Sequence, residues 1–506
     1  MITQIQLFQI GTFTFKLKHL LIIGVLILSF STSLMLRSQV LDYGSELHEF
    51  DPFFNFRATE FLVNNGLVEY YNWHDVKSWY PNGRDISATS QVMLHVTAAT
   101  TYQIFGSNME LYDFTILFPG IVGALTTIII FALVRVIGGT TAGLFASLFF
   151  AISVPIIIRG FMGWFKSEPL GLFYGLFGLY LFLSGIKSDN KKITLSKLIG
   201  GGIFMALGFA SWGGIQFFII PICIFIFVLP FLRKDFGFLI WSIPAFVISL
   251  LLTTMVFERP GVDFVLGLGG FALILPTIFL ITCSFVQKFS KSENQIRNYL
   301  ILLLTIILIG AFLIMFNTEN QFLQYPNYRY LNVINPFLTT TNPLVDSVSE
   351  HSVTSTYYSF FMHSVLMIFA GLGSWIIFNK IKFESSKDFP KHLIEFWIIF
   401  NKIKFESSKD FPKDLMVFVL IFGLVGAYVG SAFVRLELFT SLSIIFLSSI
   451  GLSIIIREIL NCKNQLHPIR NNIIKFSYVG GILILIIIPL RFSASNWNSI
   501  LDTPAI

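Results

Sequence analysis

The fold is decided by apolar runs such as KHLLIIGVLILSFSTSLML, Lys18–Leu36, which is long enough to cross a bilayer as one helix. The whole chain of 506 residues has the same character, with 55% hydrophobic residues, 12% charged residues and a mean hydropathy of +0.76. Soluble domains carry about 25% charged residues. We therefore predict an all-α, polytopic membrane protein, because helices satisfy their own backbone hydrogen bonds within lipid.

Similar runs recur along the chain and predict about thirteen membrane spans. No small-residue cleavage site follows the first run, so we interpret it as a first span and not as a removed signal peptide. Cys223, Cys283 and Cys462 show no metal-binding spacing, and the first two lie inside apolar runs, where we expect core residues. The spans are expected at residues 18–36, 112–136, 141–158, 169–186, 198–213, 215–232, 238–257, 264–286, 299–316, 358–378, 415–434, 436–456 and 475–491.

Basic residues follow the even-numbered spans, and the positive-inside rule makes those loops cytoplasmic. Lys16 and Lys18, before the first span, agree with this assignment. The net charge of +6 is explained by these loops, so it does not indicate nucleic-acid binding. The basic residues of these loops include Lys187, Lys191, Lys192, Lys197, Arg233, Lys234, Lys288, Lys291, Arg297, Arg457, Lys463 and Arg470, with a Lys-rich stretch from Lys380 to Lys413.

The odd-numbered exits must then face outward, to the cell exterior or a lumen. Two of them, at about 37–111 and 317–357, are long and hold most of the aromatic and acidic residues, so we expect the active face there. The other outward segments are the turn Arg159–Glu168, the ERPGVD stretch, the turn at Arg435 and the C-terminal tail.

One stretch, WIIFNKIKFESSKDFPK, occurs twice, at Trp375–Lys391 and Trp397–Lys413, in a predicted cytoplasmic loop. Two copies are too few for a solenoid, which needs three or more units to bury a core. We expect a tandem duplication or a sequence-assembly error without a function of its own.

Three outward segments each carry an acid: HEFDPFFNFRATEFL with Asp51, RGFMGWFKSEP with Glu168, and NPLVDSVSEHS with Glu350. Carboxylates close to a membrane are costly and usually paired or functional. Three such groups on one face form a ligand set for a hard divalent cation, Mn²⁺ or Mg²⁺. Arg435, in SAFVRLELF, could bind a lipid-borne phosphate at the same face.

Each of these residues also has a purely structural explanation. Asp51 precedes Pro52 and could cap a turn or helix. Glu168 could be an acid favoured at a helix N-terminus. Glu350 and Arg435 could be ordinary loop charges.

The stretch HEFDPFFNFRATEFLVNNG, followed by YYNWHDVKSWYPNGR, resembles the first outer loop of the catalytic subunit of oligosaccharyltransferase, the enzyme of protein N-glycosylation. SWGG at Ser211–Gly214, DSVSEH ending in His351, and VRLEL around Arg435 are similar to motifs that this family shows in the same order. The resemblance covers nearly the whole chain and is greatest to the archaeal and eukaryotic branch. It implies a C-type glycosyltransferase fold of thirteen spans, the number expected from hydropathy.

The resemblance also implies roles for the outward residues. Asp51 and Glu350 match the family's catalytic acids, which bind the metal and the acceptor amide; Glu168 matches a further metal ligand, and Arg435 the arginine of the donor phosphate. The implied reaction moves an oligosaccharide from a polyprenyl or dolichyl (di)phosphate to the asparagine amide of an acceptor polypeptide, with Mn²⁺ or Mg²⁺ as cofactor. We expect a multi-pass protein of the archaeal cell membrane rather than of the endoplasmic reticulum.

Two features depart from the family pattern. Lys166 stands where the family has the first acid of a paired motif; we expect it beside the metal ligands or at a phosphate. The chain ends at Ile506 without a Trp-Trp-Asp motif. We therefore expect a membrane domain over 1–491, the beginning of a truncated outer domain over 492–506, and a separate outer domain or subunit as a partner.

Two alternatives stay open at this point. One is a related lipid-phosphate-sugar glycosyltransferase with another acceptor. The other is a split or truncated non-catalytic subunit that binds lipid-linked sugar. A transporter is disfavoured because the ionisable residues gather at one face and not at the bilayer midplane.

Overall fold

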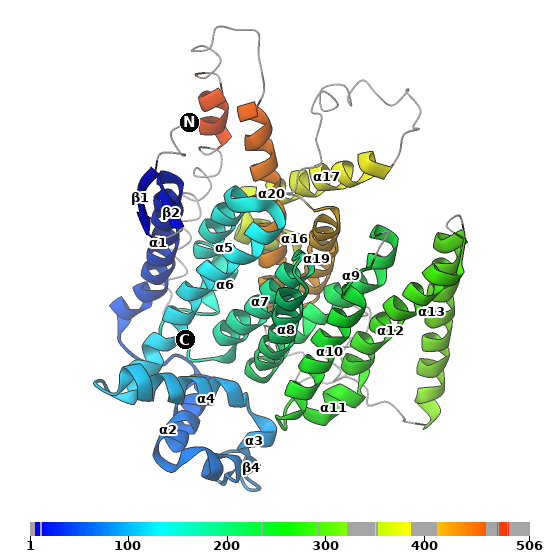
Figure 1. The fold of residues 1–506 in the computed structure, drawn as a ribbon. Helices are drawn as coiled ribbons and strands as arrows, with labels where there is room; N and C mark the ends of the chain where they lie inside the picture. Colours follow the sequence, from blue (N-terminus) through cyan, green and yellow to red (C-terminus); the bar gives the residue numbers. More distant parts are fainter. Residues whose placement is uncertain are drawn as a thin grey trace.

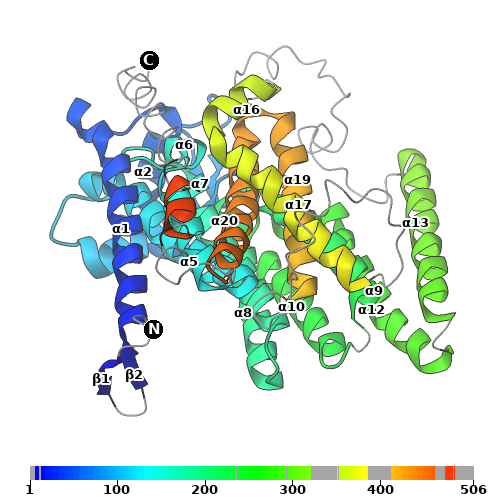
Figure 2. The same cartoon turned by 90° about the horizontal axis from the view of Figure 1, so that it is seen from above.

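The protein is a bundle of long helices in the computed structural model (Figures 1 and 2). The structure describes residues 6–10, 13–233, 236–291, 294–320, 350, 353–385, 412–461, 473, 475–482 and 484. Over these residues nine helices are long and apolar enough to cross a membrane, or ten if the bent pair Thr356–His363 and Val365–Asn379 is one span. The predicted all-α membrane fold is therefore confirmed.

The first twelve predicted spans all have helical counterparts. The thirteenth, at 475–491, is described at residues 475–482 and 484, which are helical. The counterparts are α1 (Leu17–Ser38), α5 (Leu111–Ala151) with α6 (Val154–Ile158), α7 (Ser167–Ile186), α8 (Lys191–Ser211), η4 (Gly213–Phe218) with α9 (Ile219–Leu232), α10 (Leu239–Met255), α12 (Leu268–Phe289), α13 (Gln295–Asn320), α16 (Thr356–His363) with α17 (Val365–Ser385), α19 (Lys413–Ala432) and α20 (Glu437–Asn461).

Helix α5 contains two predicted spans, because the chain doubles back within it. Gly139 has φ +81°, a left-handed conformation inside the assigned helix. The Ser147 hydroxyl donates a hydrogen bond of 3.0 Å to the carbonyl of Thr127. Twenty residues of straight helix would separate these groups by about 30 Å. The two halves of α5 are therefore antiparallel, and a turn at Gly138–Gly139 joins them.

The span at 356–385 is broken. Helices α16 and α17 meet at an angle of 96°, and Ser364 between them has φ +51°. His363 Nε2 lies 2.8 Å from Glu437 Oε1, and the Ser359 hydroxyl donates to the same oxygen. The buried Glu437 is the first residue of α20, so these bonds hold the bend against the start of that helix.

The first outer loop folds into a small helical layer at one end of the bundle. This layer lies at the bottom of Figure 1, whereas the β1–β2 hairpin lies at the opposite end of α1. The two short hairpins, β1–β2 and β3–β4, are the strands seen in the described residues. The remaining elements are β1 (Gln6–Ile10), β2 (Phe13–Lys16), η2 (Gln39–Tyr43), α2 (Phe50–Tyr71), β3 (His74–Asp75), β4 (Arg84–Asp85), α3 (Ile86–Thr89), α4 (Val92–Thr101), η3 (Tyr102–Gly106), α11 (Gly261–Leu266) and η8 (Val434–Leu436).

Contacts between loops agree with the sides assigned from charge. Arg259, in the predicted outer ERPGVD stretch, donates to the Thr89 carbonyl in the first outer loop at 2.6 Å. At the other end, Lys187 Nζ donates to the Val136 carbonyl at 2.7 Å. Arg233 pairs there with Asp414. Loops predicted on one side of the membrane thus contact each other.

Small residues allow the helices to approach closely, as is usual in membrane bundles. A Cβ at Gly178 of α7 would lie 2.8 Å from the Met205 backbone nitrogen of α8. Gly373 and Gly451 bring α17 and α20 together in the same way. Cys223 and Cys283 are buried and free, as expected.

Several sequence predictions concern residues outside the described part of the chain. These are residues 321–349 and 351–352 of the outer loop, residues 386–411 of the duplicated stretch, Cys462, and the expected start of an outer domain at 492–506.

We predict that Gly202→Ala destabilises the bundle. The added Cβ would lie 2.5 Å from the Phe246 carbonyl oxygen and 2.9 Å from the Leu250 nitrogen, so α8 and α10 would have to separate. Overpacking of this kind costs about 1–3 kcal/mol. Thermal unfolding in detergent measures the loss.

The matched control is Gly200→Ala in the same helix, where the added Cβ meets Leu181 Cδ1 at an ordinary 3.5 Å. Because alanine favours helix over glycine by about 1 kcal/mol, this variant should be at least as stable as the parent. Equal melting temperatures for the two variants would contradict the close packing of α8 on α10.

Candidate functional site

The charged residues selected from the sequence lie at the outer end of the bundle, where helices begin or end. Asp51 lies in the first turn of α2, next to the buried Pro52, and its side chain is 73% exposed. Glu168 lies in the first turn of α7 and is 1% exposed. An acid in a first helical turn is stabilised by the helix dipole, so the local sequence explains both positions. Arg435 lies in the short turn η8 between α19 and α20.

The segment 159–166 carries two further charges and is fixed by backbone contacts. The His48 amide donates to the Gly163 carbonyl at 3.1 Å, and the Gly163 amide donates to the Ile116 carbonyl at 2.9 Å. Gly163 has φ +83°, and a Cβ there would collide with the Glu46 carbonyl and the His48 ring. Glycine at this position lets the segment lie directly against the start of the first outer loop.

The predicted site residues come together in a network of two neighbouring groups of ion pairs, one around Arg435 and one around Lys166. Arg435 Nη2 lies 2.8 Å from Glu168 Oε1, and its Nη1 lies 3.5 Å from Glu350 Oε2. Lys166 Nζ lies 3.4 Å from Asp51 Oδ2. Asp51 also acts on Arg435 through its charge, as Lys166 does on Glu350. Four segments that are far apart in sequence therefore meet at one place.

Glu350 is held mainly by a residue that the sequence analysis did not select. Arg159 Nη1 donates to Glu350 Oε1 at 2.6 Å. Burial acts to raise the pKa of the Glu350 carboxyl, but Arg159, with Arg435 and Lys166, outweighs burial and holds that pKa below its ordinary value. The carboxylate is thus ionised and ready to accept hydrogen bonds at neutral pH.

Lys166 faces the acids instead of turning away from them. It pairs with Glu49 as well as with Asp51. Its ammonium lies 4.1 Å from the centre of the Trp164 ring, and the Arg159 guanidinium lies 5.7 Å from the same ring. Trp164 therefore contacts two cations of the network. With Glu49 included, the network has four carboxylates and three cations, so it carries one net negative charge.

The acidic side chains of the outer site are the donors that a metal ion would find there. Within the described residues, no group of three or more His, Cys, Asp or Glu side chains is arranged to hold a metal ion. The three predicted ligands are separated by Lys166, Arg159 and Arg435. Their chemistry nevertheless suits a hard divalent cation, and Glu168 Oε2 is buried without a hydrogen-bond partner. The carboxylates fit a metal if the cations exchange partners when it binds.

A buried chain of hydrogen bonds connects the outer helices to this network. Tyr70 Oη lies 2.5 Å from His95 Nδ1, and His95 Nε2 lies 3.1 Å from Asn55 Oδ1. Asn55 Nδ2 then donates to the Phe165 carbonyl at 2.9 Å. Asn55 is one turn after Asp51, and Phe165 precedes Lys166. The chain of bonds therefore fixes the helix of Asp51 relative to the segment of Lys166.

Sequence reasoning missed Arg159, Glu49 and the pair Asn55–His95. Arg159 and Glu49 stand inside the outward segments already selected, so their charge was a usable signal. Asn55 and His95 are 40 positions apart, and no local pattern shows that they touch.

The apolar helices of the described residues and the ion pairs at their outer end define a multi-pass membrane protein with a charged site at one face. The chain belongs to the STT3 family: the family model described as "Oligosaccharyl transferase STT3, N-terminal" matches residues 19–384, more than half of the chain.

Two curated relatives illustrate the similarity. The chain is 30% identical over 365 residues to "Dolichyl-diphosphooligosaccharide--protein glycosyltransferase subunit STT3A" of Oryza sativa subsp. japonica, covering 69% of this chain and 44% of that protein. It is 27% identical over 378 residues to subunit STT3 of Dictyostelium discoideum, covering 72% of this chain and 51% of that protein. The chain thus spans about half the length of the curated relatives it matches.

Solved structures share the fold. The apo oligosaccharyltransferase of Archaeoglobus fulgidus superposes with a TM-score of 0.70 at 16% identity, over 94% of this chain and 56% of that one. The same organism's oligosaccharyltransferase AglB, in complex with an inhibitory peptide and a dolichol-phosphate, gives 0.68 at 13%, over 95% and 56%. The Archaeoglobus fulgidus oligosaccharyltransferase in complex with Zn and sulfate has a TM-score of 0.65 at 14% identity, over 94% of this chain and 53% of that one. At these identities the likeness concerns the fold alone.

We predict that His95 makes stability fall with acidification. Burial lowers the pKa of His95 from 6.5 to about 3, so below pH 6.5 the unfolded chain binds a proton that the folded chain refuses. The contribution of neutral His95 to the free energy of unfolding is complete above pH 6.5 and is lost as the pH falls towards 3. From pH 6.5 to 5 the parent should lose about 1–2 kcal/mol more than His95→Gln. Melting temperatures at the two pH values measure this.

The control is His74→Gln, which should act in the opposite direction. His74 is exposed and paired with Asp85 at 2.7 Å, which raises its pKa. Its contribution is therefore present at low pH and fades as pH rises, so removing it should increase the loss of stability on acidification. The same pH dependence in all three proteins would contradict both assignments.

Proposed function

We propose that this chain transfers an oligosaccharide from a polyprenyl phosphate or diphosphate carrier to the side-chain amide of an acceptor asparagine. The observation that carries the proposal is the convergence of Asp51, Glu168, Glu350 and Arg435 at the outer end of the bundle. Family membership supports the same reaction. One related archaeal structure contains a dolichol-phosphate, which is the carrier part of such a donor, and another contains an acceptor peptide, the second substrate of the reaction.

Arg435 is proposed to bind the donor phosphate. Its guanidinium is held on one side by the buried Glu168 and reaches Glu350 on the other at the longer distance of 3.5 Å. A phosphate could replace Glu350 at Arg435 while Glu168 continues to orient the side chain. Arginine suits this role because its planar fork matches phosphate oxygens. Glu350 would keep its bond to Arg159 through Oε1, and its Oε2 would become available to the acceptor.

Asp51 and Glu350 are proposed to accept hydrogen bonds from the acceptor amide, which makes its nitrogen a better nucleophile. The bond between the sugar's anomeric carbon and the phosphate oxygen breaks, and the carrier phosphate leaves with the electron pair. The amide nitrogen bonds to the carbon and passes a proton to one of the two carboxylates. Both carboxylates are at the surface of the network, with exposures of 73% and 30%, so a peptide can reach them.

Asp51, Glu168 and Glu350 are also proposed to hold a divalent cation, Mn²⁺ or Mg²⁺. A bound cation would stabilise the charge that develops on the leaving phosphate. One related structure contains Zn and sulfate, which supports a divalent site in the family without selecting the ion. The active face is proposed to lie outside or in the lumen. The archaeal cell membrane stays a prediction, since both eukaryotic and archaeal relatives match.

A second candidate is a non-catalytic subunit that binds lipid-linked sugar. The specific observation in its favour is Lys166, whose ammonium lies 3.4 Å from Asp51 and opposes a metal there. Measuring donor binding and transfer on the same protein distinguishes the two functions, because a non-catalytic subunit binds the donor but transfers nothing.

We predict that Asp51→Asn and Glu350→Gln each lower transfer about 100-fold or more, the usual effect of removing a group that stabilises transition-state charge. Arg435→Met should in addition abolish binding of the lipid-linked oligosaccharide. The measurement uses the purified chain in nanodiscs, lipid-linked oligosaccharide and a fluorescent asparagine peptide. The matched control is Glu60→Gln, an exposed acid on the same helix as Asp51. Unchanged transfer in both acid variants would refute the proposed roles.

We predict that activity requires a divalent cation and that Lys166→Gln increases the apparent affinity for it. Exhaustive chelation should abolish transfer, and Mn²⁺ or Mg²⁺ should restore it. Removing a like charge at about 4 Å is worth roughly 1 kcal/mol in water, so the half-activating concentration should fall about fivefold. The control is Lys77→Gln, an exposed lysine of the same outer loop. An equal shift in both variants would mean that Lys166 acts only through the overall charge of the loop.

A further inference from the structure

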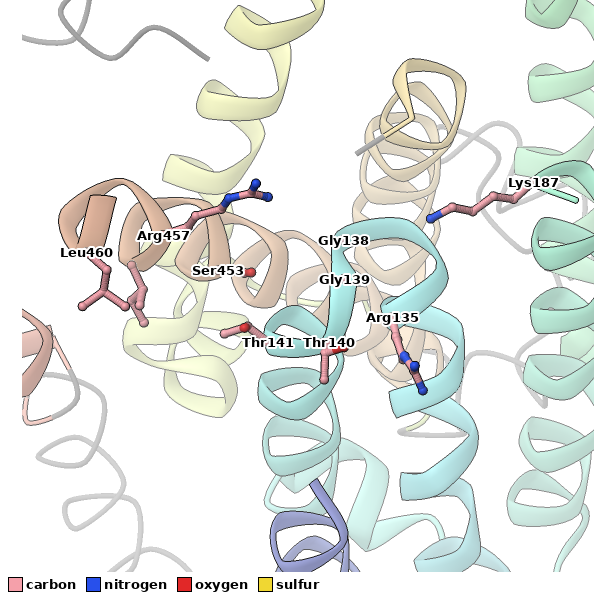
Figure 3. A pocket seen from close by; sticks show the side chains of 10 residues that line it. Arg135, Gly138, Gly139, Thr140, Thr141, Lys187, Ser453, Arg457 and Leu460 are labelled. Atoms are coloured by element: carbon pink, nitrogen blue, oxygen red, sulfur yellow. The ribbon is translucent and has the colours of Figure 1, made fainter. Parts of the chain in front are cut away.

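A cavity of about 480 Å³ lies between the turn of α5, the end of α7 and the last turns of α20 (Figure 3). This volume is in the usual range for sites that bind small molecules. The cavity is lined by Arg135, Gly138, Gly139, Thr140, Thr141, Lys187, Ser453, Ile456, Arg457 and Leu460.

The cavity is at the opposite end of the bundle from the charged site. Helix α7 begins beside Glu168 and ends immediately before Lys187. Helix α20 begins two residues after Arg435, and Arg457 lies near its end. Each helix has about 20 residues between the two places, a length of about 30 Å. The charge rule puts the Lys187 and Arg457 loops in the cytoplasm, so the cavity opens at the cytoplasmic face.

The lining is cationic and rich in hydrogen-bond donors. Among the described residues that line it are three basic side chains, from Arg135, Lys187 and Arg457, three hydroxyl groups and no acid. In Figure 3, Lys187 and Arg457 reach towards the α5 turn from opposite sides, whereas Arg135 points along its helix. The Lys187 ammonium is held at this turn by its bond to the Val136 carbonyl.

The backbone at the α5 turn supplies further hydrogen-bond donors to the cavity. Gly139, with φ +81°, reverses the chain, and a new helical segment starts after it and runs to Ala151. The first amides of that segment have no carbonyl partner within the helix, which favours an anion. Asp414, an acid at the same end of the bundle, is paired with Arg233.

We propose that this cavity binds a phosphate group at the cytoplasmic face, supplied by the headgroup of an anionic phospholipid or by free phosphate. Basic pockets between helices on this side of a membrane are suited to such headgroups. The inference is independent of the proposed glycosyl transfer, because none of the lining residues belongs to the outer site.

Lys187→Gln and Arg457→Gln in the full chain provide the test. Nanodiscs of phosphatidylglycerol and of phosphatidylcholine are compared by native mass spectrometry of the lipid retained, and inorganic phosphate is titrated separately against the melting temperature. Each substitution should weaken saturable binding about fivefold, the effect of one cation near a membrane surface. Retention of phosphatidylglycerol identifies a lipid source, and saturation by inorganic phosphate alone identifies a free one.

The matched control is Lys192→Gln, an exposed lysine in the same cytoplasmic loop as Lys187 but outside the cavity. It should bind like the parent. Equal weakening in the control would show a diffuse attraction to the basic face and overturn the proposal, as would the absence of saturable binding to both probes. Both test residues are exposed, and unchanged melting temperatures without ligand would confirm that the variants fold.

Discussion

The pairing of Arg435 with Glu168 is the interaction on which the outer site depends. Glu168 is nearly inaccessible to solvent, and a carboxylate in that position is stable only with a cation beside it. Arg435 supplies that cation and extends the pairing to Glu350, which in turn holds Arg159. Because these groups come from α7, η8, Glu350 and the turn after α6, one chain of charges joins parts of the protein that share no local sequence.

The lipid environment requires the helical bundle that brings Arg435 and Glu168 together. Helices are required where water cannot satisfy the backbone, and glycines at Gly178, Gly373 and Gly451 bring their axes close. Close packing fixes the ends of α7 and α20, which carry the outer site at one face and the basic cavity at the other. The same two helices therefore hold an acidic and a basic site on opposite sides of the bilayer.

Charge exchange connects the structure with the proposed chemistry. Each carboxylate that a metal would use is paired with a lysine or arginine, and each arginine that a phosphate would use is paired with a carboxylate. A divalent cation and a donor phosphate arriving together could satisfy both sets, since the phosphate would replace Glu350 at Arg435 and the metal would bind the free carboxylate oxygens. In this exchange Lys166 is the cation that neutralises Asp51 and Glu49 until the metal and the phosphate bind.

The sequence by itself determined the membrane class, the first twelve helical segments, the grouping of loops by side, and the choice of Asp51, Glu168, Glu350 and Arg435. These follow from hydropathy, charge and family motifs, which are properties read along the chain. The tertiary structure decided that α5 doubles back at Gly139, that α16 and α17 meet at 96°, and that Arg159 is the principal partner of Glu350. It also decided the Tyr70–His95–Asn55 chain of bonds and the basic cavity. The physical reason is the same in each case: an ion pair or hydrogen bond acts over about 3 Å in space, and only packing brings residues so distant in sequence within that range.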